Sequence, residues 1–154
     1  MGSTTRDERF MRLALDQARS AGERGEIPIG AIVVDDTGSV IASAGNARDE
    51  LHDPTAHAEV LALREAGRVR GDRLLAGCTL YVTLEPCPMC AGAVVMARVN
   101  RLVFGAWNEE YGASGSRWDI VRDRRLPHRP EVLGGVLDDE CGELVRSFLA
   151  DRRP

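Results

Sequence analysis

The sequence contains no lysine, and all 20 of its basic residues are arginines. Schiff-base catalysis and general-base catalysis by lysine are therefore excluded. Aromatic residues make up only 5% of the chain, which has three histidines and four cysteines. This scarcity leaves few ways to build a site from imidazole and thiolate groups, so the position of each of these residues carries information.

Long apolar runs are also missing, and none approaches the roughly 18 residues needed to cross a bilayer. The first twenty residues include the charged side chains Arg6, Asp7, Glu8, Arg9 and Arg12. That pattern does not fit a signal peptide. We therefore expect a soluble, cytoplasmic protein with no membrane contact, whose cysteines are thiols or metal ligands rather than disulfides.

The length of 154 residues and the apolar share of 44% predict a single domain over residues 1–154 with a real core. A net charge of −4 argues against a general nucleic-acid coat but leaves room for a local basic face. Residues 117–129 hold five Arg and two Asp, and Arg152 and Arg153 follow Phe148 near the C-terminus. Such residues could bind phosphates and stack on an RNA base, or form a solvated connector and helix end.

The residue pattern predicts an α/β fold. Apolar spacing indicates helices over 7–21, from Pro54 or Thr55 to about Gly67, over 90–97 and over 138–149, the last with Leu144, Val145, Phe148 and Leu149 on its apolar side. Apolar and β-branched runs indicate a hairpin over 29–45 and strands over 78–84, 101–106 and 131–133. Because helices separate most strands, we predict a three-layer α/β/α domain with a mixed sheet of about five strands.

Two short segments form the sharpest chemical feature, His57-Ala-Glu59 and Pro86-Cys87-Pro-Met-Cys90, each placed at the start of a predicted helix. Two thiolates at i and i+3 can hold one ion from one side, and an imidazole from a second helix supplies a third ligand. Tetrahedral zinc then keeps a fourth position for water, which is typical of a catalytic site. Glu59, two residues from the imidazole, could take a proton from that water and pass it to a substrate.

Each segment alone is weak evidence. A lone CxxC can be a redox pair, part of a structural zinc site or a chance occurrence. An HxE pair often lies on the solvent-exposed face of a helix. Together they fit one three-ligand site, since no second CxxC completes a four-thiolate site. The remaining candidates, His52, His128, Cys78 and Cys141, are not assigned to the metal; the two cysteines are expected to be buried.

Beyond this signature, several stretches resemble the zinc-dependent cytidine deaminase superfamily and, more narrowly, the bacterial tRNA adenosine deaminases. The resemblance covers residues 6–153 and includes His52–Glu59, Leu80–Cys87, Met89–Ala93, Val103–Ala106, Gly112–Ser116 and Asp139–Leu144. It implies a cytidine-deaminase-like fold, a homodimer, and hydrolysis of adenosine to inosine at the anticodon wobble position of tRNA.

The resemblance also implies roles for individual residues. One Zn²⁺ per subunit would be held by His57, Cys87 and Cys90, with Glu59 as the proton shuttle. The target nucleotide would flip out of the anticodon stem-loop, and Asn46 and the backbone N–H of Ala58 would bind its purine. Apart from the resemblance, the residues near the C-terminus indicate that the RNA could contact Phe148, Arg152 and Arg153.

One position departs from the family pattern. After Ala106, family members commonly have a basic residue and then Asp near the target ribose, whereas this chain has Trp107 and Asn108. Asp only accepts hydrogen bonds and repels phosphate, while Asn both donates and accepts and carries no charge. We therefore hypothesise that this chain discriminates RNA from DNA less strictly.

Three other functions remain open from the residues alone. A deaminase of a free nucleobase or nucleoside, of the guanine or cytosine type, would share the zinc, Glu59 and the fold. A non-catalytic zinc module that binds RNA would not need the Glu59 carboxylate. A redox CxxC protein is disfavoured by His57 and by Pro86 and Pro88, the two prolines that flank Cys87.

Overall fold

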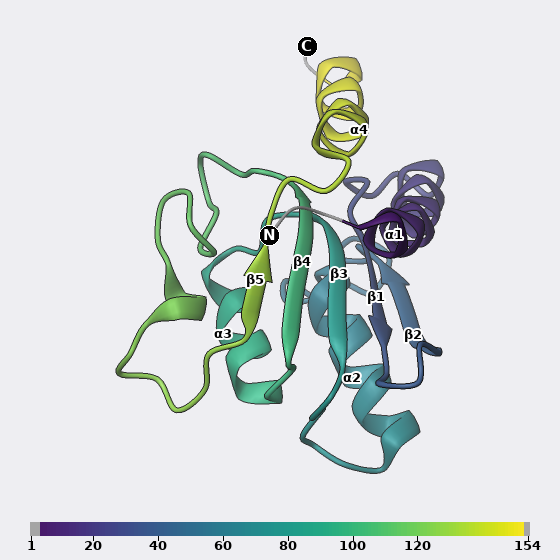
Figure 1. Ribbon diagram of the computed structural model, residues 1–154. Coiled ribbons are helices and arrows are strands. Elements are labelled where there is room, and N and C mark those ends of the chain that lie inside the picture. Colours follow the sequence, from purple (N-terminus) through teal and green to yellow (C-terminus); the bar gives the residue numbers. More distant parts are fainter. Residues whose placement is uncertain (1–3, 153–154) are drawn as a thin grey trace.

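The computed structural model describes residues 4–152, within which five strands form one mixed sheet in the order β2-β1-β3-β4-β5 (Figure 1). The strands are β1 Gly30–Val34, β2 Val40–Gly45, β3 Thr79–Leu84, β4 Arg101–Ala106 and β5 Glu131–Leu133. Strand β1 is antiparallel to β2 and to β3, while β3, β4 and β5 are mutually parallel. The predicted hairpin and mixed sheet are confirmed.

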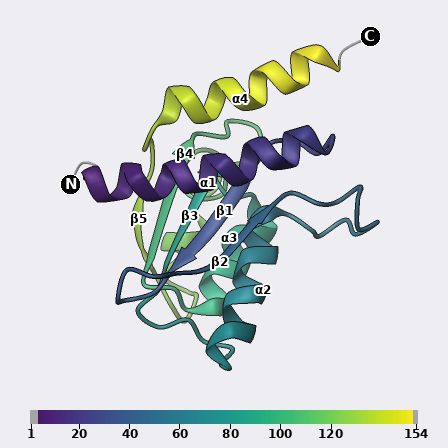
Figure 2. The ribbon, with the colours of Figure 1, turned by 90° about the vertical axis from the view of Figure 1, so that its right-hand side faces the viewer.

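Helices cover both faces of this sheet (Figure 2). On one face lie α1 Thr5–Glu23 and α4 Asp138–Asp151, and on the other lie α2 Ala58–Arg70 and α3 Pro88–Ala97. Successive strand residues alternate between the two cores: Ile32 packs with α1, and its neighbours Ala31 and Val33 pack with α2 and α3. The predicted three-layer α/β/α architecture is therefore confirmed.

The carboxyl ends of β2, β3 and β4 meet at one edge of the sheet. Since β1 is antiparallel to both of its neighbours, β2 and β3 run in the same direction, and β4 is parallel to β3. Asn46 follows β2, Cys87 comes shortly after β3, and Asn108 comes shortly after β4. Three candidate site residues thus leave the sheet at the edge where ligands bind in open α/β folds.

Both ends of helix α2 differ from the prediction, whereas the other helices extend beyond their predicted ranges by at most two residues at either end. Helix α2 begins at Ala58 rather than at Pro54 or Thr55, because the Asp53 carboxylate accepts the Thr55 N–H at 2.8 Å and holds a turn there. It ends at Arg70 rather than near Gly67, where Gly71 takes the left-handed conformation with φ 67°.

Helix α4 is less covered than its apolar pattern predicted. Among its described residues only Cys141 and Gly142 are buried, and Leu149 is 43% exposed. Its C-terminal half extends past the sheet (Figure 2), and Val145 and Phe148 are only partly buried there. Across residues 4–152, every helix is too short or too polar to cross a membrane.

Candidate metal centre

His57, Cys87 and Cys90 converge as the spacing predicted. Their donor atoms lie within 4.8 Å of one another, and the Nδ1 atom of His57 lies 3.6 Å from Cys87 Sγ and 3.4 Å from Cys90 Sγ. A tetrahedral zinc ion with ordinary Zn–N and Zn–S bonds would separate such atoms by about 3.6 Å. The donor set therefore fits zinc in both chemistry and spacing.

Local sequence explains why these side chains meet. His57 is the N-cap residue of α2 and Cys87 is the N-cap residue of α3, both in extended conformation, and Cys90 lies in the first turn of α3. Pro88 occupies the first helical turn, where a missing N–H costs no helical hydrogen bond. The free N–H groups and the positive dipole end of each helix favour anionic ligands such as thiolates.

The contacts among the three donors shift their proton affinities. Hydrogen bonds from Cys90 and His57 lower the pKa of the Cys87 thiol to about 4, against the opposing effect of burial. The hydrogen bond with Cys87 raises the pKa of His57, and it also raises that of Cys90 together with burial. These contacts favour a thiolate at Cys87, which is the form that binds metals.

Glu59 lies in the first turn of α2, two residues after His57, and is only 4% exposed. Removal from water raises the pKa of its carboxyl group above the ordinary value, although the neighbouring His57 opposes this. Its position beside the three donors, without being one of them, agrees with the sequence interpretation.

Asn46 and Ala58 are joined directly. The backbone N–H of Ala58 donates to Oδ1 of Asn46 at 3.0 Å, and both residues are buried. That N–H, expected to contact a purine, is therefore already engaged within the fold. The amide nitrogen of Asn46 is left as the group that can donate to a ligand.

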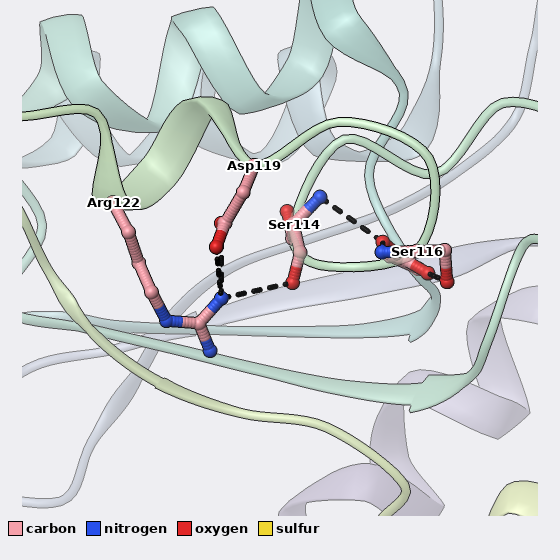
Figure 3. A network of polar contacts seen from close by, with 5 residues as sticks. Ser114, Ser116, Asp119 and Arg122 are labelled. Atoms are coloured by element: carbon pink, nitrogen blue, oxygen red, sulfur yellow. Dashed lines mark hydrogen bonds and ion pairs between the residues drawn. The ribbon is translucent and has the colours of Figure 1, made fainter.

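Asn108 lies at the start of the loop that follows β4. Its backbone N–H donates to Glu85 at 3.1 Å, and its side-chain oxygen accepts the Tyr111 N–H at 3.1 Å. Further along the loop, Arg122 Nη1 donates to the Asp119 carboxylate at 2.9 Å and to the Ser114 carbonyl at 3.3 Å (Figure 3). The loop is thus held by contacts among its own residues and with Glu85.

The other histidines and cysteines lie outside the cluster. His52 is exposed, and His128 donates to the Val99 carbonyl at 2.6 Å. Cys78 and Cys141 are buried at 0% and 1% exposure, as predicted.

The predicted RNA contacts lie at the end of the chain. Phe148 is half-buried on α4, and the Arg152 guanidinium lies 3.8 Å from its ring centroid in a cation–π contact. Arg153 lies outside the described residues.

Sequence reasoning missed two buried carboxylates that hold the loops around this centre. Glu26, 4% exposed, accepts the backbone N–H groups of Asp49 and Glu50, just after Asn46. Glu85, 1% exposed, accepts donors from the loop that contains Asn108. For Glu85, the sequence offered only its position as an acidic residue between Leu84 and Pro86, and its hydrogen-bond donors lie 23 or more positions away.

Known proteins resemble this chain over nearly all of its length. A family model, the cytidine and deoxycytidylate deaminase zinc-binding region, matches residues 4–106. The tRNA-specific adenosine deaminase of Bacillus subtilis (strain 168) is 46% identical over 149 residues, which cover 97% of this chain and 92% of that protein. That of Agrobacterium fabrum is 47% identical over 144 residues, which cover 94% of each.

Two solved structures of deaminases have the same fold as this chain. A structure from a study of A-to-I editing by tRNA:A34 deaminases at the wobble position has a TM-score of 0.85 and 48% identity, covering 88% of this chain and 98% of that one. The guanine deaminase from Nitrosomonas europaea has a TM-score of 0.82 and 26% identity, covering 97% and 86%. The fold is thus shared with both, and the sequence is nearer to the first.

Proposed function

The chain belongs to the cytidine and deoxycytidylate deaminase zinc-binding family, and from that premise we propose that it hydrolyses adenosine to inosine at the wobble position of a tRNA anticodon. One observation carries the choice of substrate: 46% identity to a tRNA-specific adenosine deaminase over 97% of this chain. Identity to a guanine deaminase of similar fold is only 26%.

The cofactor is zinc, and the proposed ligands are His57, Cys87 and Cys90, whose donor atoms lie within 4.8 Å of one another. When bound, zinc acidifies a water molecule so that an attacking oxygen is available near neutral pH. The net reaction replaces the amino group on C6 of adenine by oxygen and releases ammonia.

Glu59 is the proposed proton carrier. It takes a proton from the attacking water, delivers it to a ring nitrogen, and then supplies a proton to the leaving amine. Its place two residues after His57 supports this role, as does its burial, which protects the transferred proton from exchange with bulk water.

Asn46 is the proposed purine-binding side chain. Its oxygen accepts the Ala58 N–H, so the amide nitrogen is oriented as a donor that can reach an acceptor on the base edge. Ala58 therefore contributes by fixing Asn46, and its N–H reaches the purine directly only if that bond opens.

Recognition of the anticodon stem-loop is assigned to the end of α4. The Phe148 and Arg152 pair offers a ring for stacking and a cation for phosphate, and Arg153 adds a second cation. Arg152 reaches the α1–β1 connection: its Nη2 lies 4.0 Å from the position a Cβ would take at Gly25. The residue after Gly25 is Glu26, which accepts hydrogen bonds from the loop that follows Asn46. The end of α4 therefore lies next to the segment that holds this loop. Since tRNA functions in the cytoplasm, we place the enzyme there.

We also infer a homodimer formed through an exposed groove between α2 and α3. Val60, Ala93 and Met96 line this groove, and Met96 is 71% exposed. Its rim carries both Asp72 and Arg73, and charges of both signs suit a two-fold interface, where one patch meets its own copy. Light scattering should give twice the chain mass, and a monomeric mass would contradict the inference.

The direct test compares substrates. Zinc-loaded protein should form inosine in an anticodon stem-loop with adenosine at the wobble position, and it should leave free guanine and cytidine unchanged. Faster deamination of a free base or nucleoside would instead establish that class of substrate. RNA binding without any deamination would indicate a non-catalytic module.

A further inference from the structure

Glu85 is a buried carboxylate bound entirely by hydrogen-bond donors of one loop. Its Oε1 accepts the Asn108 N–H at 3.1 Å and the Ser116 hydroxyl. Its Oε2 accepts the N–H groups of Ser114 at 3.0 Å and Ser116 at 2.9 Å. Among the described residues no arginine forms an ion pair with it, so these donors alone offset its desolvation.

The loop is built around this carboxylate. A Cβ at Gly112 would lie 2.4 Å from Glu85 Cδ, so only glycine lets the backbone pass so close. Gly112 N–H also donates to the Asn108 carbonyl at 2.8 Å, which closes the first turn of the loop. One carboxylate thus joins both ends of the segment 108–116.

The loop held by Glu85 is also connected to the metal centre through the backbone. Glu85 N–H donates to the Ala106 carbonyl at 2.8 Å, and the Pro86 carbonyl accepts the Ala113 N–H at 2.8 Å. The next residue is Cys87, whose Sγ lies 3.6 Å from His57 Nδ1. The loop is therefore fixed to the backbone immediately before a proposed zinc ligand.

We propose that Glu85 is a positioning residue for the deamination, holding Asn108 at a fixed place relative to Cys87. This inference rests on the proposed function and on the family resemblance, which places position 108 near the target ribose. Glu85 itself does not reach the reacting atoms in this arrangement. Its contribution is the geometry of the pocket wall, and a displacement of about 1 Å in such a wall can lower a rate about a hundredfold.

Glu85→Gln is the informative variant because it keeps the shape and removes one acceptor oxygen. With its nitrogen at the Oε1 position, the Ser116 hydroxyl can turn and accept, and only the Asn108 N–H loses its acceptor. With the nitrogen at the Oε2 position, the N–H groups of Ser114 and Ser116 both lose theirs. The first orientation leaves fewer unsatisfied donors, so the variant should release Asn108 selectively.

The experiment uses the zinc-loaded enzyme and compares Glu85→Gln with Asp7→Asn. Asp7 is a matched control because it is also a buried carboxylate, 2% exposed, but lies on α1 across the sheet. In Glu85→Gln we expect amide hydrogen exchange at Asn108 to accelerate about tenfold more than at Ser114. We also expect kcat on the stem-loop to fall at least about tenfold with little change in KM and with zinc content retained.

Two serines give a milder internal comparison. Ser116→Ala removes a hydroxyl that donates to Glu85, whereas Ser114→Ala removes a buried hydroxyl without a partner among the described residues. Exchange at Asn108 should accelerate in Ser116→Ala more than in Ser114→Ala.

Three results would overturn the proposal: unchanged exchange at Asn108, loss of zinc from Glu85→Gln, or an equal loss of kcat in Asp7→Asn. Failure of the proposed function is distinguishable, because the wild-type enzyme would then leave the stem-loop unedited. The exchange measurement still decides in that case whether Glu85 holds the loop.

Discussion

The backbone N–H of Ala58 donates to Oδ1 of Asn46 across 3.0 Å, joining the residue after β2 to the first residue of α2. The bond links a proposed purine-binding side chain to the helix that begins beside His57. Because the oxygen of the Asn46 amide is engaged by this bond, the amide nitrogen is the group that can donate to a ligand.

Asn46→Asp should separate these two roles. Aspartate keeps an acceptor for Ala58 but loses the amide donor, so kcat/KM should fall by about tenfold to a hundredfold while zinc content is unchanged. Asn100→Asp is the matched control, because Asn100 also accepts a backbone N–H, from Gly77 at 3.1 Å, but at an exposed site. Equal activity in the two variants would remove Asn46 from the pocket.

Glu59→Gln should abolish most catalysis without removing zinc. The amide fills the same space but cannot carry protons, and general acid–base groups contribute about 10²- to 10⁴-fold to rates. Inosine formation, zinc content and RNA affinity should be measured on the same preparation. A variant that edits RNA at the wild-type rate would exclude Glu59 as the proton carrier.

Asn108→Asp tests the discrimination between RNA and DNA. Aspartate can still accept the Tyr111 N–H that Asn108 accepts at 3.1 Å, so the turn should persist and only the charge and the donor change. Activity on matched RNA and DNA hairpins should shift in favour of RNA. An unchanged RNA-to-DNA activity ratio would show that position 108 is neutral.

Asp7 should make the stability of the protein depend on pH. Hydrogen bonds from Arg101 at 2.7 and 3.0 Å, and from Tyr81 at 2.8 Å, hold the pKa of Asp7 below its ordinary value. A depressed pKa in the folded state contributes stability above the unfolded pKa of about 3.9, and this is lost as pH falls through the folded value.

Urea unfolding at pH 7 and pH 3 tests this directly. Asp7→Asn should cost about 3 kcal/mol at pH 7, since it removes the buried carboxylate partner of Arg101 and leaves only the exposed Glu131 at 3.5 Å, and less at pH 3. An equal loss at both pH values would show that Asp7 acts through packing alone. Activity per folded molecule should stay unchanged, because Asp7 is remote from the metal centre.

Much of this organisation was readable from local sequence. Strand β4 and strand β5 were predicted with their observed bounds, because apolar runs such as Leu102–Phe104 are buried in the sheet. The three zinc-binding candidates were found because the i, i+3 cysteine pair and the His57-Ala-Glu59 segment, each weak evidence alone, together fit one three-ligand site.

Long-range contacts were not readable in this way. The start of α2 depends on a turn held by Asp53, and the state of the Ala58 N–H depends on Asn46, which lies 12 positions away. Glu85 gave no periodic signal because all its side-chain partners come from a loop 23 to 31 positions later. That residues 1–154 form a single domain stays a prediction.

The central claim is that one zinc ion, held by His57, Cys87 and Cys90, is required for hydrolysis. The most direct measurement is the rate of inosine formation as metal-stripped protein is titrated with zinc. We expect the rate to rise in proportion to bound zinc, to level at one ion per chain, and to be absent when Cys87 is replaced by alanine. Full activity in protein shown to be metal-free would contradict the claim.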